Sequence, residues 1–103
     1  MVPKRPAKNI DKRIHESIRL RIMVQLIAQG HRLRFTQLKY HLGVTQGNLA
    51  FHLRVLQEAG LVTVSKSEAL ADSATYVRVT DAGREAFVAY LEALDDLLDA
   101  LKG

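Results

Sequence analysis

The sequence predicts a mainly α-helical fold with one small β-hairpin. Apolar residues recur at helical spacing over four segments, while two short segments alternate β-branched with polar residues. The predicted helices are residues 11–29, 36–42, 46–59 and 81–102. The predicted strands are residues 61–66 and 75–79. A chain of 103 residues is long enough for one hydrophobic core, so we expect a single compact unit.

Charge is distributed unevenly along the chain. Residues 1–66 hold 12 Lys and Arg against 3 Asp and Glu, whereas residues 67–103 hold 3 against 8. A basic surface attracts a polyanion because counterions are released on binding. We therefore expect the first part of the chain to face a polyanion and the acidic part to face away. An accidental division between two solvated surfaces is the alternative.

The composition argues against several classes of protein. Because there is no Cys, disulfides, thiolate metal sites and Cys nucleophiles are excluded. No segment approaches the ~18 consecutive apolar residues of a membrane span, and no apolar leader follows the N-terminus. We expect a cytoplasmic protein with no membrane partner.

The N-terminal part begins with an expected arm and a helix. Residues 1–10 carry two prolines, three basic residues and little to bury, which indicates a mobile basic arm. The helix over residues 11–29 is expected to end at Gly30. Its apolar positions are Ile14, Ile18, Ile22, Met23, Leu26 and Ile27. Residues 31–34 are long enough only for a brief strand.

The order of elements over residues 36–59 is that of a helix-turn-helix motif. Thr36 is a candidate N-cap of the first helix. Gly43 suits the left-handed conformation that often follows a helix end, Val44 is an apolar plug, and Thr45 caps the second helix. The inward residues of the first helix are Phe35, Leu38 and Leu42. In DNA-binding proteins with this motif, the second helix lies in the major groove.

The helix over residues 46–59 has two distinct faces. Taking about 100° per residue, we expect a buried stripe of Leu49, Leu53 and Leu56. The opposite face carries Gly47, Phe51, Arg54 and Glu58. Gln46 and Ala50 flank that face on one side, and Asn48 and His52 on the other. Gly60 is expected to end the helix, and the hairpin that follows is then a wing.

The last helix has a long apolar seam. Thr80 is its expected N-cap, and Asp81 and Glu85 complement the helix dipole. Its apolar positions are Phe87, Leu91, Leu94, Leu98 and Leu101, widened by Tyr90 and Leu97. This is the spacing of a coiled-coil seam, and the chain has little left to cover it, so we expect a homodimer. Packing against the chain's own first helix is the alternative.

Three segments match phrases of a known family. Residues 19–23 (RLRIM) are similar to the RLxIL of its first helix, and residues 47–62 to its recognition helix entering the wing. Residues 76–84 (YVRVTDAGR) look like the phrase that closes the wing. In this order, over about residues 14–94, they resemble bacterial and archaeal winged-helix transcriptional regulators of the ArsR/MarR kind.

The resemblance implies a winged helix-turn-helix fold and a dimeric, sequence-specific DNA-binding regulator. We expect residues 1–10 to form the arm, residues 11–80 the DNA-binding domain and residues 81–103 a dimerisation helix. The wing departs from the family pattern, because its loop carries Glu68 and Asp72 rather than basic residues. Phosphate contact is therefore expected at the base of the wing rather than at its tip.

The candidate DNA-contacting residues centre on the second helix of the motif. Gln46 and Asn48 lie in its first turn, and amide side chains bind adenine bidentately. Arg54 suits a phosphate or a guanine, with ordinary surface charge as the alternative. Phe51 either contacts a thymine methyl group or packs against the wing. The full set is Thr45, Gln46, Gly47, Asn48, Phe51, His52, Arg54, Arg34, Lys39, Lys66 and Arg78.

Three of these candidates have further alternatives. Gly47 allows either close approach of the backbone to DNA or simple flexibility of the turn. Thr45 more often caps a helix than contacts DNA, although the N–H groups beside it suit a phosphate. His52 either orients the helix or contacts a phosphate.

The histidines do not predict a metal site. None of His15, His31, His41 and His52 is paired at i, i+3 or i+4 on one helix, and no Cys or nearby carboxylate completes a set. No nucleophile–base pair or phosphate-binding glycine loop indicates an enzyme. We expect no cofactor.

The sequence thus predicts a homodimeric transcription factor, expected to be a repressor, whose recognition helix at about residues 45–59 enters the major groove of double-stranded DNA. The alternative is a winged-helix protein–protein interaction module without specific DNA binding. The operator, the target genes, the sign of regulation and any small-molecule effector are not given by the sequence.

Overall fold

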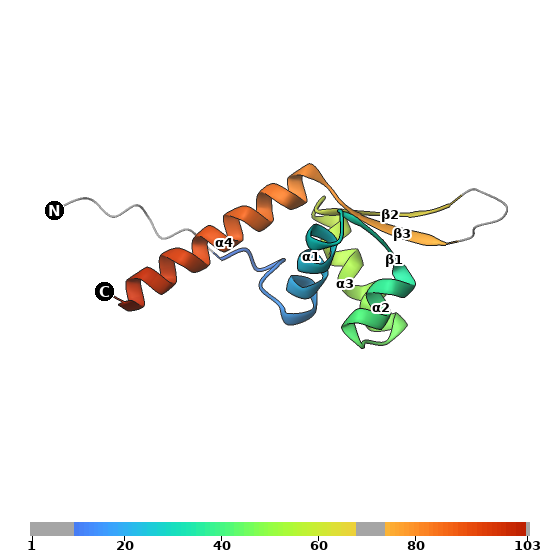
Figure 1. Cartoon of the computed structure of the whole chain (residues 1–103), viewed down its shortest axis with the longest axis horizontal. Coiled ribbons are helices and arrows are strands. Elements are labelled where there is room, and N and C mark those ends of the chain that lie inside the picture. Colours follow the sequence, from blue (N-terminus) through green and yellow to red (C-terminus); the bar gives the residue numbers. More distant parts are fainter. Residues whose placement is uncertain (1–9, 68–73, 103) are drawn as a thin grey trace.

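The computed structural model describes residues 10–67 and 74–102. In these residues the elements follow the order α1 (Ser17–Ala28), β1 (Arg32–Arg34), α2 (Phe35–Leu42), α3 (Gln46–Glu58), β2 (Val62–Lys66), β3 (Thr75–Val79) and α4 (Asp81–Lys102). Figure 1 shows α1, α2 and α3 gathered beneath a narrow sheet, with α4 running away from it. The predicted mainly α-helical fold with a β-hairpin wing is confirmed.

The three strands form an antiparallel sheet in the order β1-β3-β2. Leu33 pairs with Val77, and Val77 pairs in turn with Val64, so these side chains share the inner face. Helices α1 and α2 contact β1 and β3, and α3 contacts β2, which places all three helices against that face. The brief strand expected at residues 31–34 thus becomes a third strand of the wing sheet.

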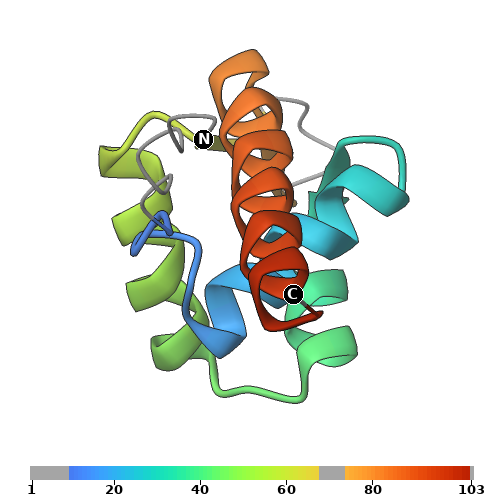
Figure 2. The same ribbon diagram turned by 90° about the vertical axis from the view of Figure 1, so that its left-hand side faces the viewer.

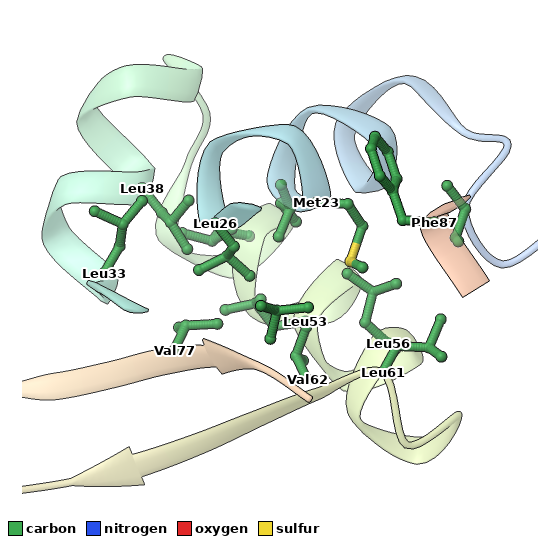
Figure 3. Close-up of a cluster of buried hydrophobic side chains, with 14 of the residues drawn as sticks. Met23, Leu26, Leu33, Leu38, Leu53, Leu56, Leu61, Val62, Val77 and Phe87 are labelled. Carbon is green, nitrogen blue, oxygen red and sulfur yellow. The ribbon is translucent and has the colours of Figure 1, made fainter. Parts of the chain in front are cut away.

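One hydrophobic core joins the inner face of the sheet to the helices. Figure 3 shows Met23, Leu26 and Leu38 from the helices facing Val62 and Val77 from the strands. The largest fully buried side chains are Ile14, Ile22, Met23, Leu26, Leu38, Leu49, Leu56, Val62 and Val77. The buried stripe predicted for α3 is confirmed, since Leu49, Leu53 and Leu56 are all buried.

The first helix starts later than predicted. Helix α1 begins at Ser17, capped by the Glu16 carboxylate, which accepts a hydrogen bond from the Arg19 N–H at 2.8 Å. Before it, the Asp11 carbonyl accepts the N–H of His15 at 2.8 Å in a turn. Ile14 is fully buried from this turn, so its helical spacing misplaced the start of the helix. Residues 1–9 of the predicted arm lie outside the described part of the chain.

The caps around the helix-turn-helix are partly as predicted. Thr36 is not the N-cap of α2, because the helix already begins at Phe35 and the Gln37 side chain accepts the Arg34 N–H at 2.9 Å. Gly43 adopts the predicted left-handed conformation at φ 65°. Thr45 caps α3 as predicted, with its hydroxyl accepting the Asn48 N–H at 3.1 Å. The Thr45 side chain therefore stabilises the first turn of α3.

Helix α4 divides into two parts. The Thr80 hydroxyl accepts the Gly83 N–H at 2.9 Å and donates to the Gly60 carbonyl at 2.7 Å, which ties the start of α4 to the end of α3. Phe87 and Tyr90 are buried in the chain's own core. Assigning these two residues to an intermolecular seam was therefore wrong, because α1 and the turn before it already cover them.

The second part of α4 extends past the domain. Figure 1 shows its C-terminal turns leaving the body of the molecule, and Figure 2 looks toward that end. Leu94 is partly buried against the core. Along the whole of α4, the exposed large apolar side chains are Val88, Leu91, Leu97, Leu98 and Leu101. The chain's own first helix thus covers only the first half of the predicted seam.

Candidate nucleic-acid interface

The exposed face of α3 carries most of the predicted contact residues side by side. We call this the recognition face, formed by Gln46, Gly47, Asn48, Phe51 and Arg54, all of them exposed. Phe51 is 53% exposed, and its ring meets that of His52 in a T-shaped arrangement with 5.1 Å between the ring centroids. Its predicted alternative, burial against the wing, does not occur. The face therefore offers two amides, a guanidinium and an aromatic ring to an external partner.

Gly47 is not required by the protein's own fold. A Cβ atom added there would meet no atom within 4 Å, and its backbone is not in the left-handed region. Glycine is otherwise a poor residue inside a helix, costing about 1 kcal/mol relative to alanine. A small residue at this place therefore suits an object outside the chain that approaches the helix closely.

A groove separates α3 from the wing. It is lined by Phe35, Gln46, Ala50, Leu53, Arg54, Gln57, Val64 and Thr75. Gln46 and Arg54 therefore reach both the recognition face and the side of α3 that the wing overhangs. Lys66 pairs with Thr75, so its side chain lies on this same face of the sheet. Arg54 thus lines the groove from α3, and Lys66 lies on the sheet face that borders this groove.

His52 is turned toward the core rather than toward solvent. Only 8% of the residue is exposed, and its Nδ1 atom lies 2.9 Å from Arg19 Nη1 and 3.5 Å from Glu16 Oε1. Because a guanidinium only donates, His52 Nδ1 accepts this bond. Arg19 also donates to the Arg13 carbonyl at 2.6 Å. Of the two predicted roles of His52, its burial and its contact with Arg19 favour orienting α3 over contacting a phosphate.

Helix α2 adds residues beside the recognition face. Lys39 is exposed and lines a shallow groove with Thr36, Tyr40, Gly43 and Val44. Tyr40 is 84% exposed, which is unusual for an aromatic side chain. In helix-turn-helix proteins the first helix of the motif crosses the DNA backbone. The predicted set omitted Tyr40, although an aromatic residue off the Phe35, Leu38 and Leu42 stripe was a usable signal.

Arg34 and Arg78 lie apart from the other candidates. Arg34 pairs with Tyr76 and Arg78 with Arg32, so all four side chains share the sheet face opposite the helices. Because side chains alternate along a strand, these residues point to the sheet face opposite that of Lys66. The residues of α3 and α2 and the side chain of Lys66 thus lie on the helix side of the sheet, whereas those of Arg34 and Arg78 lie on its other face. Arg34 also borders a groove with Phe35, Thr36 and Thr75. Glu68 and Asp72 in the wing loop lie outside the described residues.

Asp11 and Arg13 form an ion pair in the turn before α1. The Arg13 guanidinium, at 2.8 Å from the Asp11 carboxylate, lowers the pKa of Asp11, and the carboxylate in turn raises the pKa of Arg13.

Within residues 10–67 and 74–102, no three His, Asp or Glu side chains gather into a metal-binding cluster. No helix in that part of the chain is both long and apolar enough to cross a membrane.

The fold and this surface agree with comparisons to known proteins. A family described as "Winged helix DNA-binding domain" matches residues 18–98, which is most of the chain. The chain belongs to this family. The predicted resemblance to winged-helix transcriptional regulators is therefore confirmed.

Relatives of this winged-helix chain include archaeal and bacterial proteins. An uncharacterised protein of Methanocaldococcus jannaschii is 35% identical over 74 residues, covering 72% of this chain and 79% of that protein. A transcriptional regulator homologue of Pyrococcus horikoshii matches with a TM-score of 0.80 and 35% identity, over 86% of this chain and 87% of that one. YusO of Bacillus subtilis, at 15% identity, shares the fold with a TM-score of 0.75 over 87% of this chain and 62% of its own. The winged-helix family and the Pyrococcus horikoshii homologue support a transcriptional regulator, whereas YusO shows the fold alone.

Proposed function

We propose that this winged-helix protein is a sequence-specific DNA-binding regulator that inserts the recognition face of α3 into the major groove. The observation that carries the proposal is the exposed face of α3, with Gln46, Asn48 and Arg54 beside a glycine that the fold does not need. Amide and guanidinium side chains are those that read adenine and guanine edges. The Thr45 cap and the His52–Arg19 hydrogen bond would fix the position of this helix for that task.

Positively charged residues around α3 would hold the DNA backbone. Lys39 on α2 and Lys66 at the wing lie on either side of the recognition face and are exposed. Phosphate contacts of this kind fix the register of a protein on the duplex without reading sequence. Phe51 is placed to contact a thymine methyl group from the middle of α3. Thr45 contributes as the cap that presents the first N–H groups of the helix.

The active form would be a homodimer joined through the second part of α4. Leu98 and Leu101 are 53% and 84% exposed on turns that extend past the domain. Contiguous exposed apolar surface of this kind marks an interaction site. A two-fold dimer would place two α3 helices at major grooves about 34–36 Å apart, one helical turn of DNA. Repression then requires only that the bound dimer cover a promoter.

Selection from random duplex DNA followed by two variants tests this proposal. The protein should enrich an inverted repeat, and Gln46→Ala with Arg54→Ala should lower affinity for it by about 1–3 kcal/mol per lost base contact. Gln29→Ala with Arg84→Ala removes the same two types of side chain from exposed positions elsewhere, and its affinity should equal that of the wild type. Equal affinity of all three proteins, or no enriched sequence, would favour the protein–protein interaction module instead.

A further inference from the structure

The sheet face turned away from the helices carries a dense cluster of arginines. We call it the outer sheet face, and its residues are Arg32, Arg34, Thr63, Ser65, Tyr76 and Arg78. Figure 1 shows α1, α2 and α3 all on the other side of the strands. The outer sheet face is therefore turned away from the helices, including α3 with its recognition face. The arginines need another explanation.

Two of these arginines face each other directly. Arg32 and Arg78 are cross-strand partners in the β1–β3 pair, and both are exposed. Like charges in this arrangement destabilise a sheet. Neither arginine forms an ion pair with any residue in the described ranges, and strands β1, β2 and β3 contain no Asp or Glu. The repulsion would be relieved by an anion from outside the chain.

Tyr76 organises the cluster. The guanidinium carbon of Arg32 lies 4.5 Å from the centroid of the Tyr76 ring, and that of Arg34 lies 5.7 Å away. Contact with the face of the Tyr76 ring restrains the Arg32 guanidinium, and stacking of this kind leaves the edge of that planar group able to bind a phosphate. Thr63 and Ser65, the neighbours of Arg78 and Tyr76 on β2, are small and polar and leave the approach open.

The composition of this face fits a phosphate backbone better than a protein. Exposed large hydrophobic residues occur on α1, α2, α3 and α4, but none lies on the described strands. Protein interfaces need an apolar core, whereas nucleic-acid interfaces are polar and strongly positive. Arginine forks also match the geometry of phosphate oxygens bidentately.

We propose that the outer sheet face binds the phosphate backbone of a second segment of duplex DNA while α3 holds the first. The proposal rests on DNA binding by α3, to which it adds a second surface. A protomer with both surfaces occupied would bridge two duplexes, or two distant parts of one. Arg32 and Arg78 are the residues that carry this second contact.

A capture experiment with the full chain tests the bridge. Beads carrying the selected inverted repeat are saturated with protein, so that both α3 helices of a dimer are occupied, and a labelled duplex of unrelated sequence is added. Wild-type protein should retain the labelled duplex in a salt-sensitive way. Arg32→Gln with Arg78→Gln should load on the beads equally and retain about tenfold less.

A control variant and a second probe separate binding by the outer sheet face from a general effect of charge. Arg84→Gln with Lys102→Gln removes two positive charges from α4, and it should retain the labelled duplex as the wild type does. Equal retention by the Arg32/Arg78 variant, equal losses in both variants, or equal retention of labelled poly-glutamate would overturn the proposal. Failure of the wild type to load on the beads would refute DNA binding by α3. Loading without retention would refute the second surface alone.

Discussion

Gly47 and Gly83 are both glycines in the first turn of a helix, yet their surroundings are opposite. A Cβ on Gly83 would collide with the Leu61 carbonyl and with the Val79 side chain, whereas one on Gly47 would meet nothing within 4 Å. Gly83 is thus needed for α4 to pack closely against the backbone at Leu61. Gly47 has no such internal reason.

Replacing Gly83 should therefore damage the fold. Gly83→Ala forces apart two backbone segments, and overpacking of this kind costs about 1–3 kcal/mol in the free energy of unfolding. Gly47→Ala is the matched control, expected to leave that free energy unchanged or raise it by up to about 1 kcal/mol. Urea titrations measure both. A Gly83→Ala protein as stable as the wild type would show that α4 shifts freely.

The same Gly47→Ala variant separates the two explanations for this glycine. If DNA approaches the backbone at the start of α3, the added methyl group should lower operator affinity by about tenfold, comparable with loss of one base contact. The measurement is a fluorescence anisotropy titration with the selected duplex. Full affinity in a fully folded protein would mean that Gly47 serves only the flexibility of the turn.

At the scale of elements, most local signals predicted the structure, with Thr36 as the exception, whereas features that depend on distant contacts were not predicted. Gly43, Thr45 and Thr80 act through their own backbone neighbours, and each does what its residue type predicts. The burial of Ile14 from a turn depends on contacts distant in sequence. Its spacing alone could not separate it from a helical residue.

The candidate site shows the same limit. Helical periodicity predicted the exposed face of α3, because the buried and exposed sides of one helix are fixed by its own sequence. Strand alternation placed Arg34 and Arg78 on one side of the sheet, but which side the helices cover is decided by the whole fold. The helical position of His52 predicts that it borders the core. Its contact with Arg19 of α1 depends on how the two helices pack, so the sequence did not predict it.

Helix α4 gives the testable case at this scale. Leu98→Glu places a charge on the exposed apolar side of the second part, where we propose a partner helix, while leaving the buried Phe87 and Tyr90 untouched. Sedimentation should then show monomers with a normal helical spectrum. Ala89→Glu adds the same charge to an exposed position on the opposite side of α4 and should remain dimeric. A Leu98→Glu dimer would show that the seam is not the interface.

At the scale of the whole molecule, basic and acidic residues are concentrated in different parts of the fold. Residues 11–80 carry most of the basic residues, and α4 carries most of the acidic ones. A dimer joined through α4 would therefore keep its acidic surface away from a bound duplex. The outer sheet face adds a second positive surface on the far side of the wing.

The salt dependence of duplex binding tests the central claim most directly. Arg54, Lys39 and Lys66 are the exposed basic residues that we propose contact phosphates or bases around α3, three in each protomer. A dimer making six such contacts should lose affinity with a slope of about −5 in log K against log salt. The Gln46→Ala/Arg54→Ala variant should show a shallower slope than the wild type. Absence of duplex binding at about 50 mM salt, or a slope near zero, would contradict the account.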